Sequence, residues 1–289
     1  MTSAHEARPA AASGTFLVGG DVPVHRLGFG AMRITGSGVW GEPPDRAEAV
    51  RLVRRAVELG VTLIDTADSY GPGVSEEIIA EALHPYPDDV LIATKGGFER
   101  RGPDEWVTNG RPEHLRRAVD SSLRRLRLER IDLYQLHRLD PRVPWEESIG
   151  ILVDLRDDGK LRHLGLSEVG IDEIDAIRRT TPVATVQNRY NVADRAWDDV
   201  VDHCEAAEIG FIPWSPIGSG GLSAPGGIVA EIARRRRMTA PQVSLAWLLW
   251  RSPVMLPIPG TSSVAHLEEN LHAGRLKLGD DDLRELADA

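Results

Sequence analysis

Val61-Thr-Leu-Ile-Asp65, the segment 74–83 and Val90-Leu-Ile-Ala-Thr94 follow one another and decide the fold. The two flanking runs are short and apolar, which is typical of buried strands, whereas apolar residues in 74–83 recur every three or four positions, as in an amphipathic helix. Two strands that are joined through a helix pair in parallel, with the helix on one face of the sheet. This stretch therefore predicts an α/β fold with a parallel sheet.

The same alternation continues along the chain. Strand-length runs occupy 26–30, 61–65, 90–94, 131–136, 161–166, 184–187, 209–213 and 254–258. Helical patterns occupy 45–59, 74–83, 112–128, 144–158, 171–179, 196–207, 239–251 and 263–273. Eight such units close most simply into a (β/α)8 TIM barrel, a fold that typically has about 250 residues. Residues 15–18 and 22–24 predict a short N-terminal β-hairpin in front of it.

The ends of the chain and one glycine motif define the domain organisation. Residues 1–14 are rich in Ala, Ser and Pro, and we expect them to form a disordered leader. Residues 15–289 are expected to form a single domain that ends in a short helix at 280–289. The stretch Gly28-Phe-Gly30-Ala-Met-Arg33 begins like a dinucleotide fingerprint but lacks its third glycine, so no Rossmann domain is predicted.

Charge and composition exclude several classes of partner. The chain has 34 basic and 44 acidic residues, a net charge of −10, which argues against binding to nucleic acid or to an anionic membrane. Cys204 is the only cysteine, which excludes an internal disulfide and fits a reducing cytoplasm. The histidines show no metal-ligand spacing, so no metal is expected, and the Arg234–Arg237 run is interpreted as a solvated helix end.

Chemistry in such a barrel lies at the carboxyl ends of the strands. Asp65, Tyr70, Lys95 and His137 follow three successive strands and would converge there. A tyrosine, whose pKa is ordinarily about 10, can donate a proton near neutrality if a cation stabilises the phenolate. Lys95, one of only three lysines, would supply that cation, Asp65 would hold it, and His137 would orient a substrate oxygen.

Motifs along the chain extend this candidate site. They are Leu27-Gly-Phe-Gly-Ala-Met32, Asp65-Thr-Ala-Asp-Ser-Tyr-Gly71, Thr94-Lys95, Leu136-His137, Gly165-Leu-Ser167, Gln187-Asn188, Ile258-Pro-Gly-Thr261 and Glu269-Asn270. In this order, from residue 26 to residue 273, they resemble the aldo-keto reductases. The resemblance implies a barrel that binds NADP(H) without a Rossmann domain and reduces carbonyl groups by hydride transfer, with Tyr70 as the general acid.

The resemblance also implies a set of cofactor contacts. Ser167 and Gln187 match positions that hold the nicotinamide carboxamide, and Trp214 matches the aromatic ring that stacks on the nicotinamide. The full expected set is Gly30, Ala31, Met32, Asp65, Ser167, Glu168, Gln187, Trp214, Ser215, Pro216, Ile217, Gly218, Gly220, Leu222, Gly260, Thr261, Ser262, His266, Glu269 and Asn270.

Two positions depart from the family pattern. Glu168 stands where the family usually has Asn, so an amide that donates and accepts hydrogen bonds is replaced by a carboxylate that only accepts. Gly260 and His266 stand where the family often has Lys and Arg, which would hold the 2′-phosphate. NADPH is nevertheless expected in preference to NADH.

The expected substrate pocket is apolar and aromatic. Its residues are Met32, Trp40, Tyr70, Trp106 and His137, and the loop 96–110, which carries Trp106, is expected to form part of its wall. Such a pocket suits small aldehydes, including aromatic ones. The segments 38–46 and 258–270 resemble a bacterial branch of the family that includes pyridoxal reductases, so pyridoxal is one expected substrate.

Other interpretations remain open at this stage. Taken singly, Asp65 could be a helix N-cap, Tyr70 a loop aromatic, Lys95 a surface lysine and His137 a structural histidine. Lys95 could instead be the amine of a Schiff-base aldolase, although Asp65 would keep it protonated. A third interpretation is a redox sensor or auxiliary subunit that binds the cofactor without rapid turnover. The sequence does not predict an oligomeric state.

Overall fold

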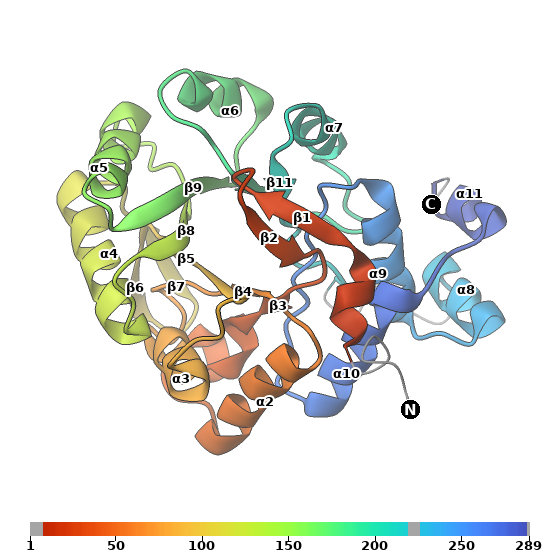
Figure 1. Cartoon of the computed structure of the whole chain (residues 1–289). Coiled ribbons are helices and arrows are strands. Elements are labelled where there is room, and N and C mark those ends of the chain that lie inside the picture. Colours follow the sequence, from red (N-terminus) through yellow and green to blue (C-terminus); the bar gives the residue numbers. More distant parts are fainter. Residues whose placement is uncertain (1–7, 219–225, 288–289) are drawn as a thin grey trace.

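The computed structural model describes residues 8–218 and 226–287. Seven strands form one parallel sheet that curls into a ring, and Figure 1 looks along the axis of this ring. Around the ring they are β11 (Gly210–Phe211), β10 (Thr185–Gln187), β9 (Leu161–Ser167), β8 (Ile131–Leu136), β5 (Leu91–Gly96), β4 (Leu63–Asp65) and β3 (Phe29–Gly30). The predicted α/β barrel is therefore confirmed.

The segment 254–259 closes the ring in the eighth position. On one side Phe211 N–H donates to the Val254 carbonyl at 2.9 Å, and Leu256 N–H donates to the Phe211 carbonyl at 2.7 Å. On the other side Gly28 N–H donates to the Pro257 carbonyl at 2.9 Å. Pro257 and Pro259 have no N–H to donate, so this predicted strand forms only an isolated bridge to β11 instead of a regular ladder.

Helices surround the ring, and the expected ones are confirmed to within two residues at each end. They are α2 (Arg46–Glu58), α3 (Val74–Leu83), α4 (Pro112–Leu126), α5 (Trp145–Asp157), α6 (Ile171–Arg178), α7 (Asp198–Ala206), α9 (Ala240–Arg251), α10 (Val264–His272) and α11 (Asp280–Ala287). A further helix, α8 (Ile228–Arg236), was predicted only by its basic end. The expected loop 96–110 contains an antiparallel hairpin, β6 (Phe98–Gly102) and β7 (Glu105–Thr108).

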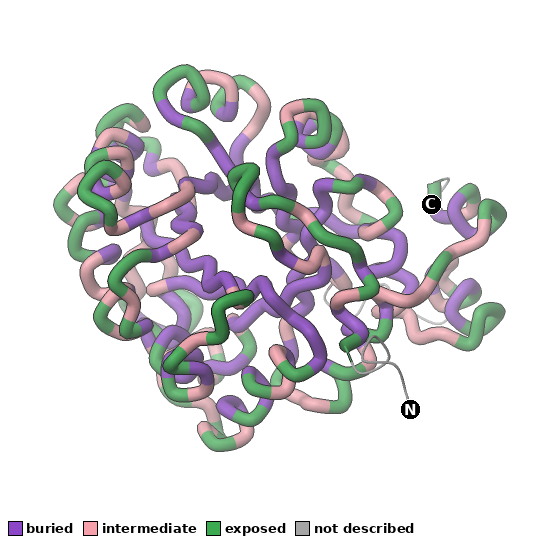
Figure 2. The backbone as a smooth tube through the Cα atoms, viewed as in Figure 1, coloured by how far each residue is buried: buried purple, intermediate pink, exposed green. Residues whose placement is uncertain are grey.

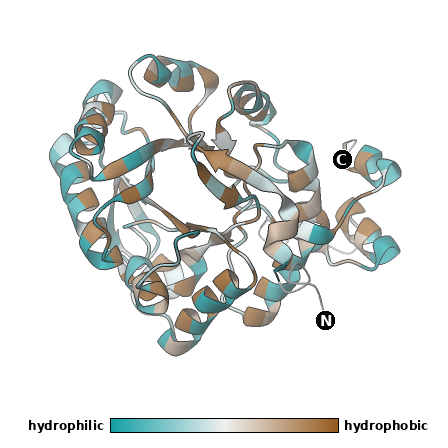
Figure 3. Ribbon diagram, viewed as in Figure 1, coloured by the Kyte–Doolittle hydropathy of each residue, from teal (hydrophilic) through white to brown (hydrophobic). Residues whose placement is uncertain are grey.

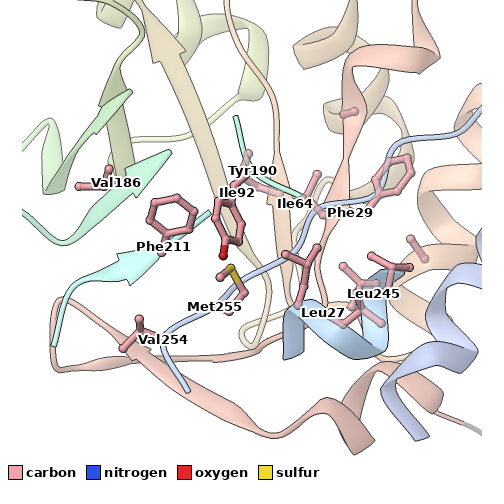
Figure 4. Packing of buried hydrophobic residues seen from close by; sticks show 14 of the residues in the cluster. Leu27, Phe29, Ile64, Ile92, Val186, Tyr190, Phe211, Leu245, Val254 and Met255 are labelled. Atoms are coloured by element: carbon pink, nitrogen blue, oxygen red, sulfur yellow. The ribbon is translucent and has the colours of Figure 1, made fainter. Parts of the chain in front are cut away.

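Alternation along the strands produces two apolar layers. Side chains that point outward, such as Ile64, Ile92, Val186 and Phe211, pack against the helices in the main core (Figure 4). Inward-pointing side chains form a second, smaller cluster inside the ring, which includes Leu63, Leu91, Ala93, Leu133 and Ile212. The ring of strands is accordingly buried, whereas the outer surfaces of the helices are exposed and hydrophilic (Figures 2 and 3).

The predicted N-terminal hairpin covers one end of the ring. Its strands β1 (Thr15–Val18) and β2 (Val22–His25) lie in front of the ring in Figure 1. Val18 and Val24 belong to the inner apolar cluster, so the hairpin seals this end with side chains that also pack the barrel interior. Asp21 in its turn accepts hydrogen bonds from Arg162 at 2.8 Å and from His163 at 2.6 Å, which anchors the hairpin to β9.

Residues 8–14 differ from the expected disordered leader. Pro9–Ser13 form a 3-10 helix, η1, which contacts a second one, η5 (Ala273–Arg275). Ala10 is fully buried, and the Ser13 hydroxyl accepts a hydrogen bond from Leu27 N–H at 2.9 Å. Small side chains, which suggest disorder by composition, here allow the backbone to pack closely. Residues 1–7 lie outside the described part of the chain.

Two further features of the fold are the single cysteine and the length of the helices. Cys204 is a free thiol that is buried in α7 and packs in the main core. None of the helices in the described ranges is long and apolar enough to cross a membrane.

Candidate active site

A buried ion pair forms the base of the site. Asp65 is the last residue of β4 and Lys95 lies near the end of β5, and both side chains point into the ring. Lys95 Nζ donates to Asp65 Oδ2 at 2.6 Å and to the Thr66 carbonyl at 2.8 Å. Burial opposes the charge of Lys95, but Asp65 and Tyr70 outweigh it and raise the pKa of the ammonium group. Lys95 therefore carries a positive charge in the free protein.

Two amides hold the other oxygen of the carboxylate. Gln135 and Gln187 each donate from Nε2 to Asp65 Oδ1, at 3.0 Å and 2.9 Å. Sequence reasoning missed Gln135, although alternation within 131–136 would have pointed it inward beside Leu133. With these bonds both carboxylate oxygens are satisfied, so Asp65 is fixed in position under Lys95.

Tyr70 lies above this pair on the loop between β4 and α3. Its hydroxyl is 3.5 Å from Lys95 Nζ. Gly73, the residue that precedes α3, has φ +86°, a conformation that favours glycine and lets the chain turn into the helix. Burial raises the pKa of the Tyr70 hydroxyl, while Lys95 partly counteracts it. Tyr70 is consequently protonated at neutral pH and can donate its proton.

His137 completes the predicted set at the end of β8. Its ring centroid is 6.0 Å from that of Tyr70, in an edge-on arrangement. Burial, Lys95 and Arg138 together lower the pKa of His137 well below its usual range, so the imidazole is neutral. The structure thus brings all four expected residues to one end of the ring.

The β6–β7 hairpin supplies the aromatic wall. Phe98 and Trp106 lie edge-on to His137, with centroid distances of 4.7 Å and 6.4 Å. Arg100 stacks on the Trp106 ring at 3.7 Å and holds that ring in place. Trp40, which was expected in the substrate pocket, does not line the cavity but lies behind Arg100, 5.6 Å from its guanidinium.

A cavity of about 610 Å³ opens above these groups. The expected residues that line it are Gly30, Met32, Asp65, Tyr70, Trp106, His137, Ser167, Gln187, Trp214, Ser215, Pro216, Ile217, Gly218 and Gly260. Four further residues line the cavity: Phe98 belongs to the expected loop 96–110, whereas Arg33, Arg138 and Ile258 were not anticipated. Arg33 lies three residues after the end of β3 and Arg138 two residues after the end of β8, so their place in the barrel was the available signal.

The other expected cofactor residues lie elsewhere. Ala31, Thr261, Ser262, His266, Glu269 and Asn270 do not line this cavity, and Gly220 and Leu222 lie outside the described residues. The Glu269 carboxylate accepts a hydrogen bond from the Thr239 hydroxyl at 2.8 Å, and Asn270 is buried. The segment after Gly260 therefore borders the site without entering the cavity.

Glu168 has a role that its sequence position did not reveal. Its Oε1 accepts hydrogen bonds from Trp214 Nε1 at 2.6 Å and from Arg189 N–H at 2.7 Å. It does not line the cavity. Because Trp214 does, the carboxylate orients an aromatic wall residue instead of presenting its own oxygens to a ligand.

Comparison with known proteins agrees with this geometry. The profile of the Aldo/keto reductase family matches residues 26–289. An uncharacterized oxidoreductase of Schizosaccharomyces pombe is 47% identical over 277 residues, covering 96% of this chain and 90% of the relative. Pyridoxine 4-dehydrogenase of Escherichia coli is 42% identical over 280 residues, covering 95% and 97%. An aldo-keto reductase from Klebsiella pneumoniae, solved in complex with NADPH, has a TM-score of 0.81 at 26% identity, covering 95% and 94%.

The chain belongs to the aldo/keto reductase family. It is accordingly an oxidoreductase, and the resemblance recognised from its motifs is confirmed.

Proposed function

We propose that this protein reduces small aldehydes or ketones to alcohols with NADPH, and that Tyr70 is the general acid. The observation that supports this most directly is the buried Lys95–Asp65 ion pair, 2.6 Å long, beneath a protonated tyrosine that faces a cavity. The charged state of Lys95 argues against the Schiff-base aldolase, which needs a neutral amine.

Each residue of the site has its own role in proton transfer to the substrate. Tyr70 gives its hydroxyl proton to the carbonyl oxygen, and Lys95, 3.5 Å away, stabilises the phenolate that remains. Asp65 keeps Lys95 charged and in place, while the one N–H of neutral His137 donates a hydrogen bond to the same oxygen. When bound, the reduced cofactor supplies the hydride that adds to the carbonyl carbon.

Residues along the cavity fit such a cofactor. Trp214 offers an aromatic face, and Ser167 and Gln187 offer polar side chains at adjacent strand ends. The backbone of 215–218 continues the lining beyond them. The NADPH-bound Klebsiella neighbour and the pyridoxine 4-dehydrogenase relative support NADPH as cofactor and pyridoxal among the substrates. The buried single cysteine, Cys204, supports a cytoplasmic location.

Arg33 offers a cation beside Gly260, which is one of the two positions where the family often has Lys or Arg and this chain has neither. A Cβ atom on Gly260 would lie 3.6 Å from Arg33 Cγ, so the Arg33 stem lies beside the space that a lysine at 260 would enter. Arg33 lines the cavity, is exposed and has no ion pair among the described residues. We therefore expect Arg33→Gln to weaken NADPH binding by about tenfold and NADH binding much less, measured by fluorescence quenching without substrate. Equal weakening of NADPH and NADH binding would show that Arg33 does not bind the 2′-phosphate.

Turnover tests the whole proposal. Loss of NADPH absorbance would be followed for the wild-type protein and Tyr70→Phe across aldehydes and ketones, including pyridoxal, and repeated with NADH. We expect turnover that depends on Tyr70. Tight NADPH binding without turnover of any carbonyl would favour the redox sensor instead.

A further inference from the structure

Arg138 follows His137 directly and lines the cavity. Its Nη1 donates to the His137 carbonyl at 2.7 Å and to the Ser167 hydroxyl at 2.9 Å. Its guanidinium lies 5.7 Å from the centroid of the Phe98 ring. Nε and Nη2 have no hydrogen-bond partner in the ranges 8–218 and 226–287. The side chain is half-buried, so Nε and Nη2 are only partly accessible to water.

Some half-buried arginines of this protein have carboxylate partners, and others, such as Arg26, donate only to backbone carbonyls. Arg125 binds Glu76 at 2.6 Å and Arg251 binds Asp202 at 2.7 Å. Arg138 has no carboxylate within ion-pair distance among the described residues. Burial lowers the pKa of its guanidinium, and the nearby Glu168 carboxylate and Tyr70 only partly counteract this effect.

Arg100 shows what a purely structural arginine looks like in the same region. It also lacks a carboxylate partner, but its three nitrogens donate to five backbone carbonyls, at 2.8 to 3.2 Å. These bonds tie the β6–β7 hairpin to the chain around Gly38 and Ser69. Arg138, by contrast, donates to the described part of the protein through Nη1 alone. Its other donors are available to a ligand.

We propose that Arg138 binds an anionic oxygen group, a carboxylate or phenolate, that the substrate carries close to its reacting carbonyl. This rests on the proposed function, since it names the substrate class of the same site. Lys95 is neutralised by Asp65, and Arg33 is the cation that the proposed function assigns to the cofactor, whereas Arg138 has no carboxylate partner in the described part of the chain. A guanidinium presents parallel N–H donors that match a carboxylate, and the bound anion would compensate its charge.

The position of Arg138 limits where the anion can lie. Its hydrogen bonds place it between His137, which orients the carbonyl, and Ser167 at the end of the next strand. An anion far from the aldehyde carbon would point toward the cavity mouth instead. The preference should therefore be strongest when the two groups are near neighbours on the substrate.

Matched substrates test this directly. The 3- and 4-formylbenzoates would each be compared with the corresponding neutral formylbenzamide, and kcat/KM measured for both. We expect the wild-type protein to prefer the benzoate, more strongly for the 3-isomer, in which the two groups are closer. In Arg138→Met the ratio of the two kcat/KM values should fall by about tenfold or more, the size of one charge-assisted hydrogen bond. Arg138→Lys, which keeps the charge, should restore part of it.

A control variant separates local contact from overall charge. Arg101 is an exposed arginine on the same β6–β7 hairpin and does not line this cavity. Arg101→Met removes the same charge, and we expect the benzoate-to-benzamide ratio to stay within about twofold of wild type, because exposed charges are largely screened.

Cofactor binding distinguishes the competing role for Arg138. If Arg138→Met lowers kcat/KM equally for benzoate and benzamide and weakens NADPH binding, the arginine serves the cofactor and the proposal fails. If the wild-type protein turns over no carbonyl, the proposed function fails separately. Calorimetric binding of benzoate and benzamide to the NADPH complex then still tests Arg138, because loss of benzoate selectivity in Arg138→Met would support the anion site and unchanged selectivity would overturn it.

Discussion

The two ends of the barrel are built from the same strands but differ in the side chains that point into the ring. At the hairpin end, Val18 and Val24 pack on Leu63, Leu91 and other apolar side chains of the inner cluster. At the opposite end, two positions further along β4, the inward residue is Asp65. The corresponding residue of β5 is Lys95, two positions after Ala93.

This difference separates stability from chemistry along one strand. The sealed end buries apolar side chains away from water, and this burial stabilises the folded state. The open end keeps a buried charge pair satisfied by two amides, an arrangement that contributes little net stability but fixes a cation below Tyr70. Variants at the two ends should therefore affect different measurements.

The largest effect is expected from Tyr70→Phe at the open end. The ring and its packing remain, while the proton is lost, so kcat should fall by at least about 100-fold with NADPH affinity largely retained. NADPH oxidation and fluorescence quenching would measure the two quantities. A variant with the wild-type rate would show that another group is the acid.

Leu133→Ala tests the sealed end. Leu133 is fully buried in the inner cluster, and its truncation should lower the free energy of unfolding by about 2 to 5 kcal/mol. The kcat/KM of the folded protein should change by less than about threefold, because Leu133 does not line the cavity. Leu17→Ala, at a 51% exposed position of the hairpin, serves as the control with little loss of stability. Denaturant unfolding would compare them, and equal losses would contradict the inner packing role.

Glu168→Ala should have an intermediate effect at the open end. Removal of the acceptor leaves Trp214 Nε1 without its 2.6 Å hydrogen bond, so the ring loses its fixed orientation. We expect NADPH binding to weaken by roughly fivefold, or about 1 kcal/mol, which is the net value of a typical hydrogen bond. Glu168→Gln, which keeps one acceptor oxygen, should lose less. Unchanged affinity in both variants would show that the orientation of Trp214 is set elsewhere.

The smallest effect concerns Asp68 and pH. Burial, and next the charge of Glu76, raise the pKa of Asp68 to about 8, whereas the unfolded chain would have a pKa of about 3.9. Its stabilising contribution is therefore complete below about pH 4 and is lost as pH rises toward 8. Asp68→Asn, which resembles the neutral acid, should raise the Tm at pH 8, with a difference that shrinks toward pH 4. A constant Tm difference across this range would contradict the raised pKa.

The strand ends explain how much of the site could be predicted. The barrel was recognisable from alternating strand and helix patterns, and a barrel brings Asp65, Lys95 and His137 to one end whatever their sequence separation. Gln135 was overlooked because it lies within a strand, although its inward direction follows from the period of two. The β6–β7 hairpin was missed because charged and glycine residues in 98–108 hide its alternation.

The sequence by itself determined the ring of β/α units, the gathering of Asp65, Tyr70, Lys95 and His137 at one end of it, and the family, because these depend on periodicity and on residue types at strand ends. Only the tertiary structure decided which side chains lie beside one another and form hydrogen bonds or ion pairs. It showed Glu168 bonded to Trp214, Arg33 beside Gly260, and Arg138 with unused donors in the cavity. Such pairing depends on distances of a few ångströms between segments far apart in the chain, and periodicity along one segment carries no information about them.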